Sequence, residues 1–157
     1  MVVGLVLSLL MVLLQDLKYR NIHVVFPILI FVFSGLLFHK KAWLSPVIYL
    51  TNAAFFTVIL IVLIVYMSIK DKKFVNPFTH YFGLGDLLFY LSITPLFATY
   101  HYVLFFILSM LFAIILHLSF KKIIKGDAIP LAGFAALLLL LLIGKDLLFT
   151  FTKTTLL

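Results

Sequence analysis

The chain has 157 residues, of which 66% are hydrophobic and 11% charged; its mean hydropathy is +1.31 and its net charge +7. Because soluble domains are only about 45–50% apolar, this composition excludes a soluble globular protein and indicates an integral membrane protein. The chain has no cysteine, which excludes disulfides, thiolate metal sites, cysteine nucleophiles and a lipoprotein anchor.

The apolar runs predict helices. Residues 55–66 and 137–143 are apolar at nearly every position, whereas the strands of a membrane barrel alternate apolar and polar residues. A helix needs about 20 residues to cross the hydrocarbon, so the chain can hold about six. We expect an all-α polytopic bundle of about six transmembrane helices that forms one domain over residues 1–157. The expected spans are 1–20, 23–38, 43–69, 82–100, 102–120 and 128–149.

The first span is expected to be retained, because residues 1–14 contain no Lys or Arg and so lack the basic region of a signal peptide. Asp16 follows an apolar run of only about 15 residues, which is short for a span. We therefore expect the first helix to include Asp16, about one turn inside the membrane border.

The fourth span begins at the tetrapeptide Gly83-Leu84-Gly85-Asp86. A carboxylate at a membrane border is costly and by default marks a functional site. Gly83 and Gly85 lack a Cβ, so they allow another chain to approach closely, as an extended substrate segment must. Pro95 is expected to kink this span.

Orientation follows from the basic residues, which are in excess in cytoplasmic loops. With the N-terminus outside, the inside loops hold eight of the twelve Lys and Arg residues and the outside segments hold four. The first span then ends, and the fourth begins, at the cytoplasmic face. Asp16 and Asp86 are therefore expected at similar depth in the same leaflet. The positive charge is explained by topology, so nucleic-acid binding is not needed.

Two aspartates that share a proton are the minimum equipment of an aspartic protease, and the surrounding motifs resemble those of the prepilin peptidases. This family of membrane aspartyl proteases of the Gly-x-Gly-Asp type includes archaeal preflagellin peptidases. Gly83-Leu84-Gly85-Asp86 matches its second motif fully, although Leu88 stands where many members carry Lys. The stretch that is similar to its first motif reads Asp16-Leu17-Lys18-Tyr19-Arg20-Asn21-Ile22-His23-Val24.

In that stretch, His23 and Val24 replace the family's Pro-Asn. The segment from Ile129 to Gly133 is more loosely similar to the family's Ile-Pro-Phe-Gly-Pro. The resemblance implies a peptidase that cleaves the leader of type IV pilin-like precursors at the cytoplasmic face of the plasma membrane. Asp16 and Asp86 would be catalytic, and no metal or organic cofactor would be required. Large bacterial members also N-methylate the new N-terminus and carry zinc-binding cysteines, so this cysteine-free chain is expected to lack the methyltransferase activity.

Other interpretations remain open. Asp16 alone could face lipid headgroups at a helix end, and Asp86 alone could bind the free amides of a helix start. The pair could also bind a proton or cation in a small transporter or a membrane assembly subunit. A presenilin-like protease is disfavoured because it pairs Gly-Leu-Gly-Asp with a Tyr-Asp motif in the preceding span, whereas Gln15 precedes Asp16. The five histidines are scattered and predict no metal site.

Overall fold

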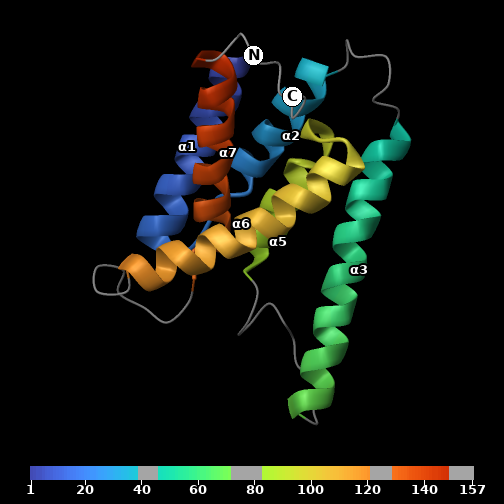
Figure 1. Cartoon of the computed structure of the whole chain (residues 1–157). Coiled ribbons are helices and arrows are strands. Elements are labelled where there is room, and N and C mark those ends of the chain that lie inside the picture. Colours follow the sequence, from blue (N-terminus) through green and yellow to red (C-terminus); the bar gives the residue numbers. More distant parts are fainter. Residues whose placement is uncertain (39–45, 72–82, 121–128, 149–157) are drawn as a thin grey trace.

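The computed structural model describes residues 1–38, 46–71, 83–120 and 129–148, and every regular element in these ranges is helical (Figure 1). The expectation of an all-α protein is therefore confirmed for the described part of the chain. In chain order the elements are α1 (Val2–Tyr19), α2 (Val25–Phe38), α3 (Pro46–Asp71), α5 (Leu84–Ser92), the 3-10 turn η1 (Thr94–Leu96), α6 (Thr99–Phe120) and α7 (Leu131–Leu148).

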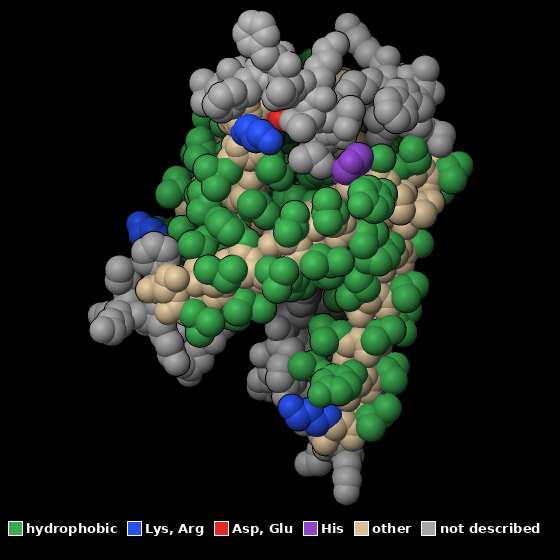
Figure 2. All heavy atoms as spheres, viewed as in Figure 1, with side chains coloured by type: hydrophobic (Ala, Val, Ile, Leu, Met, Phe, Trp, Pro, Cys, Tyr) green, Lys and Arg blue, Asp and Glu red, His purple; other side chains and the backbone are tan. Residues whose placement is uncertain are grey.

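Three of the described helices, α1, α3 and α6, are long and apolar enough to cross a membrane. Large hydrophobic side chains cover the visible face of α3 and α6 (Figure 2). Ile61 on α3 is 53% exposed, and Ile115 on α6 is 61% exposed. Such surfaces are stable in lipid and costly in water. These helices support the assignment as a membrane protein.

The helices form a packed group and one outlying helix (Figure 1). α1 packs against α2 and α7, and α6 crosses α7 obliquely. α3 contacts α5, η1 and α6 through its first half, where Asn52 and Phe56 are fully buried. Its C-terminal half extends away from the other helices. The closest packing thus surrounds α1 and α7, which run antiparallel.

The turn between α1 and α2 is short. α1 ends at Tyr19, and Arg20 adopts a left-handed conformation (φ 54°, ψ 25°) in which its N–H donates to the Asp16 carbonyl. The side-chain oxygen Oε1 of Gln15 then accepts a hydrogen bond from the N–H of His23 at 2.9 Å. A helix end with a left-handed residue reverses the chain within a few residues, so the start of α2 lies beside the end of α1.

The expected continuous span over 82–100 is instead broken. α5 ends at Ser92, η1 follows, and the backbone of Phe97 is extended before α6 begins. Pro95 explains the break, because a proline has no N–H and its ring clashes with the preceding turn. The chain therefore changes direction at the point where a kink was predicted.

The carbonyl groups at this break are bound by side chains. Nδ2 of Asn52, on α3, donates to the carbonyls of Thr94 at 3.0 Å and Phe97 at 2.9 Å. The hydroxyl of Thr94 donates to the Leu91 carbonyl at 2.8 Å. In lipid each unsatisfied backbone group costs several kcal/mol, so Asn52 stabilises irregular backbone that water cannot reach.

Aromatic rings fill the space between α3, α5 and α6. The Tyr90 ring lies 5.4 Å from that of Phe56 and 5.0 Å from that of Phe106, centroid to centroid. The Tyr90 hydroxyl bonds to that of Ser109 at 2.7 Å, and the Tyr102 hydroxyl donates to the Tyr90 carbonyl. These contacts fix α5 against α6 and so hold the helix that carries Asp86.

Candidate active site

Asp16 lies on the buried face of α1. Leu5, Leu9, Val12 and Asp16 recur at spacings of three and four residues and are all buried, which is the period of one helix face. Asp16 is only 6% exposed, and this face turns toward α7. The helical period therefore aims the carboxylate into the bundle instead of toward the headgroups.

Asp86 lies in the first turn of α5. Gly83 precedes the helix in an extended conformation, and its N–H donates to Oδ2 of Asp86 at 3.2 Å. The N–H of Asp86 donates in turn to the Gly83 carbonyl. Because glycine has no side chain, only the Asp86 half of a capping box is formed: its carboxylate binds the N–H of the residue that precedes the helix. The capping interpretation of Asp86 is thus correct for one of its two oxygens.

The other oxygen of Asp86 and one oxygen of Asp16 both lie at the start of α7, where they accept hydrogen bonds. The N–H of Ala132 donates to Oδ1 of Asp86 at 2.7 Å, and the N–H of Gly133 donates to Oδ2 of Asp16 at 2.6 Å. Successive backbone amides lie closer than the Cα spacing of about 3.8 Å, so these two oxygens are within roughly 9 Å of each other. Side chains 70 positions apart in sequence are therefore held by two consecutive amides.

The electrostatics of this arrangement are mixed. The first N–H groups of a helix have no partner inside the helix and carry a partial positive charge, which stabilises carboxylates. Two carboxylates that share one site repel each other, so together they favour a state that holds one proton. The geometry can support general acid and general base chemistry by one pair of groups.

Two glycines allow this close packing. A Cβ on Gly133 would lie 3.0 Å from Oδ2 of Asp16, and a Cβ on Gly85 would lie 2.9 Å from Cδ1 of Ile22. Gly83 is exposed, and a Cβ there would lie 3.1 Å from Oδ2 of Asp86. The glycines expected to give room to a substrate thus also make room for the chain's own side chains.

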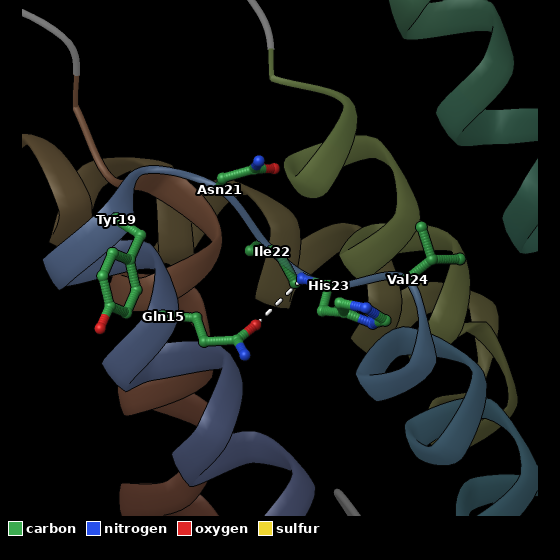
Figure 3. A pocket seen from close by; sticks show the side chains of 6 residues that line it. All are labelled: Gln15, Tyr19, Asn21, Ile22, His23 and Val24. Carbon is green, nitrogen blue, oxygen red and sulfur yellow. Dashed lines mark hydrogen bonds between the residues drawn. The ribbon is translucent and has the colours of Figure 1, made fainter.

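A pocket of about 410 Å³ opens beside the α1–α2 turn (Figure 3). Gln15 and Tyr19 contribute from the last turns of α1, and the remaining lining residues come from the connecting segment (Figure 3). The full lining is Gln15, Tyr19, Asn21, Ile22, His23 and Val24. Ile22 lines this pocket and also lies close to Gly85, so the pocket lies next to the start of α5, which carries Asp86.

Of the other acidic residues and histidines, some lie elsewhere in the described helices and some lie outside the described residues. Asp146 lies near the other end of α7, while Asp127, His39 and His80 fall outside the described residues. Among the described residues, no three His, Cys, Asp or Glu side chains are grouped so that they could hold a metal ion.

Sequence reasoning assigned no role to Ala132 and Gly133. Their contribution comes from main-chain N–H groups, which every residue except proline possesses, so residue type carries little signal for it. The available signal was the position of Pro130 directly before the helix, since proline is common at helix starts, where the free amides lie.

No family model, curated protein or solved structure matches the chain.

Proposed function

We propose that the protein is a membrane aspartyl endopeptidase that cleaves the leader of type IV pilin-like precursors at the cytoplasmic face of the plasma membrane, without N-methyltransferase activity. The observation that carries this proposal is the convergence of Asp16 and Asp86 on the consecutive amides of Ala132 and Gly133. Aspartic proteases use a pair of carboxylates that share one proton as their catalytic groups.

The proposal includes six spans with the N-terminus outside. In that layout the first span ends, and the fourth and sixth spans begin, at the cytoplasmic face. Asp16 in the last turns of α1 and Asp86 in the first turn of α5 each bind one of the first amides of α7, which supports this layout. Most of the basic loop residues on which the orientation rests lie outside the described residues.

The hydrogen bonds favour different roles for the two aspartates. Both oxygens of Asp86 accept backbone N–H groups, and such bonds favour the ionised form. Asp16 accepts the N–H of Gly133 through Oδ2 alone, so fewer backbone bonds stabilise its ionised form and it is the better candidate to carry the shared proton. Asp86 is therefore proposed as the general base and Asp16 as the general acid.

The reaction is a hydrolysis. Asp86 takes a proton from water as the water oxygen bonds to the scissile carbonyl carbon, and Asp16 gives its proton to the carbonyl oxygen. The tetrahedral intermediate then breaks its C–N bond. The leaving nitrogen receives the proton held by Asp86, and one hydroxyl of the intermediate returns a proton to Asp16, which restores the starting state of the pair. The products are a new carboxyl group and a new amine. The proposed mechanism uses no metal or cofactor. Exposed Gly83 and its neighbour Gly85 are proposed to contact the substrate backbone.

A small transporter or assembly subunit that binds a proton or cation through the same pair is the alternative. Both carboxylates face N–H donors at the positive end of α7, which disfavours a cation at this place. Flux of protons or ions that depends on both aspartates, without proteolysis, would favour the alternative.

The test is cleavage of a candidate precursor in liposomes, with the new N-terminus identified by mass spectrometry. The precursor should have a short basic leader, a glycine and a long apolar helix. Asp16→Asn and Asp86→Asn keep an oxygen that can accept the α7 amides but lose the acid–base chemistry, so we expect cleavage to fall at least about 1000-fold. Asp146→Asn, which removes an aspartate from the other end of α7, should retain wild-type activity. Retained cleavage in either of the first two variants would contradict the proposal.

The pH dependence gives a second test. Below the range in which the pair holds one proton, Asp86 is protonated and the base is lost; above it, both groups are ionised and the acid is lost. We therefore expect a bell-shaped profile of kcat/KM for the wild type and for Asp146→Asn. A profile that rises or falls without a maximum would contradict a shared proton.

A further inference from the structure

Four of the six residues that line the pocket at the α1–α2 turn have polar side chains, and none of the six is acidic. Gln15, Tyr19 and Asn21 carry N–H or O–H donors, and so does the imidazole of His23. The lining residues come from the end of α1 and the segment that follows it (Figure 3). The volume of about 410 Å³ lies within the roughly 300–1,000 Å³ of small-ligand sites. The pocket therefore suits a ligand that is rich in hydrogen-bond acceptors.

A positive charge lies beside these donors. Nζ of Lys18 lies 5.0 Å from the centre of the Tyr19 ring, and Tyr19 lines the pocket. The ring attracts a cation over its face, so the ammonium group is held near the pocket. Asp16, the one acidic residue in the stretch 15–24, is buried and binds the N–H of Gly133. The charge around the pocket therefore favours an anion.

The helix surfaces that continue from the pocket are apolar. Met11 lies one turn before Gln15 on the same face of α1. Ile28 lies one turn after Val24, whose carbonyl accepts the N–H of Ile28 at 3.3 Å. Both Met11 and Ile28 are exposed, and the two helices that carry them pack against each other. Since α1 ends and α2 begins at the pocket, a ligand with a polar, anionic head and apolar chains matches this surface.

We propose that the pocket binds the phosphate headgroup of an anionic phospholipid, whose acyl chains lie along Met11 of α1 and Ile28 of α2. The donors of the lining bind the phosphate oxygens, and Lys18 offsets the negative charge. α1 is long and apolar enough to cross a membrane, so the pocket at its end lies at the border where headgroups are found. This inference does not rest on the proposed peptidase activity.

Two other ligands share part of this chemistry. The leader of the proposed precursor is a polar peptide, but it is basic, so Lys18 would repel it, and it has no acyl chains for the apolar surface at Met11 and Ile28. Free phosphate carries the same negative charge as the headgroup but also lacks acyl chains. Competition with each of them distinguishes these ligands from a lipid.

The first experiment measures lipid binding to the full-length protein in detergent by native mass spectrometry. The probes are dioleoyl phosphatidylglycerol, which is anionic, and dioleoyl phosphatidylcholine, which is zwitterionic. We expect the wild type to prefer phosphatidylglycerol. Lys18→Gln should weaken the binding of this lipid about fivefold, which is the contribution of one lysine near a membrane surface. Asn21→Ala should weaken it about two- to tenfold, because one hydrogen bond is lost.

Lys70→Gln is the matched control. Lys70 is an exposed lysine in the last turn of α3 and does not line the pocket, so this variant should bind phosphatidylglycerol as the wild type does. Lys18, Asn21 and Lys70 are all exposed, so the three variants should fold. Equal weakening in Lys18→Gln and Lys70→Gln would indicate general attraction to surface charge and would overturn the pocket as the site. Equal binding of the two lipids, or displacement of phosphatidylglycerol by equimolar inorganic phosphate or by a synthetic basic leader peptide, would overturn the assignment to a lipid headgroup.

The second experiment locates the acyl chains and uses the absence of native cysteine. Met11→Cys is labelled with a fluorophore, and its quenching in liposomes is compared between phosphatidylglycerol and phosphatidylcholine with brominated acyl chains at the same mole fraction. Val62→Cys, at an exposed position of α3, is the control. We expect stronger quenching by the anionic lipid at position 11 and equal quenching by the two lipids at position 62. Equal quenching at position 11 would overturn the placement of the acyl chains.

Discussion

Two regions of the molecule provide partners for backbone groups inside an apolar bundle, and they use different side chains. At the break after α5, the amide of Asn52 donates to the carbonyls of Thr94 and Phe97. At the start of α7, two carboxylates accept the amides of Ala132 and Gly133. A neutral group suffices for capping in the first region. Asn, Ser or Thr would also cap helix amides in the second, so two mutually repelling acids exceed what capping requires, and the proposed acid–base chemistry would account for them.

The largest stability effect is expected where the neutral side chain caps carbonyls. Asn52→Leu leaves the Thr94 and Phe97 carbonyls without their side-chain partner, and the cost of the two together is about 2–4 kcal/mol. The measurement is the melting temperature of the protein in detergent. Thr51→Ala is the control, because the Thr51 hydroxyl bonds within its own helix and is exposed. A melting temperature equal to that of the wild type would exclude a structural role for Asn52.

The next largest stability effect is expected at Gly133 of α7, and the same substitution at Gly144 in that helix serves as the comparison. Gly133→Ala places a methyl group 3.0 Å from Oδ2 of Asp16, and such overpacking costs about 1–3 kcal/mol. Gly144→Ala meets no atom within 4 Å, so it should stabilise the helix by about 0.5–1 kcal/mol. Opposite shifts in melting temperature are therefore expected from the same substitution in one helix. The Gly133 variant should also cleave precursor more slowly. Shifts of equal sign would contradict the packing at Asp16.

The smallest stability effect is expected for the carboxylates themselves. Asp16→Asn and Asp86→Asn retain an oxygen for the α7 amides and leave one carboxyl group, which no longer meets the repulsion that arises when both are ionised. Stability should therefore change by less than about 1 kcal/mol or increase. The measurement is again the melting temperature, set beside the cleavage assay. A large loss of stability in both variants would make the aspartates structural, as Asn52 is, and would remove the contrast between the regions.

Much of the site could be predicted from the sequence because membrane helices constrain depth. The short apolar run before Asp16 and the position of Asp86 after Gly83-Leu84-Gly85 predicted two acids at one level. The hydrogen bonds to Ala132 and Gly133 could not be predicted, because main-chain amides have no distinguishing side chain. The break at Pro95 was predicted only as a kink, since the partner that stabilises the open carbonyls is Asn52, on another helix.

The sequence by itself determined the helical membrane class and the pairing of Asp16 with Asp86 as a hypothesis, because apolar length and charge position depend on local composition. Only the tertiary structure decided that α7 supplies the amides that hold both acids, and that Ile22 fills the space at Gly85. The physical reason is that these contacts join segments more than 40 residues apart. Their geometry follows from how the helices pack, and no single segment encodes it.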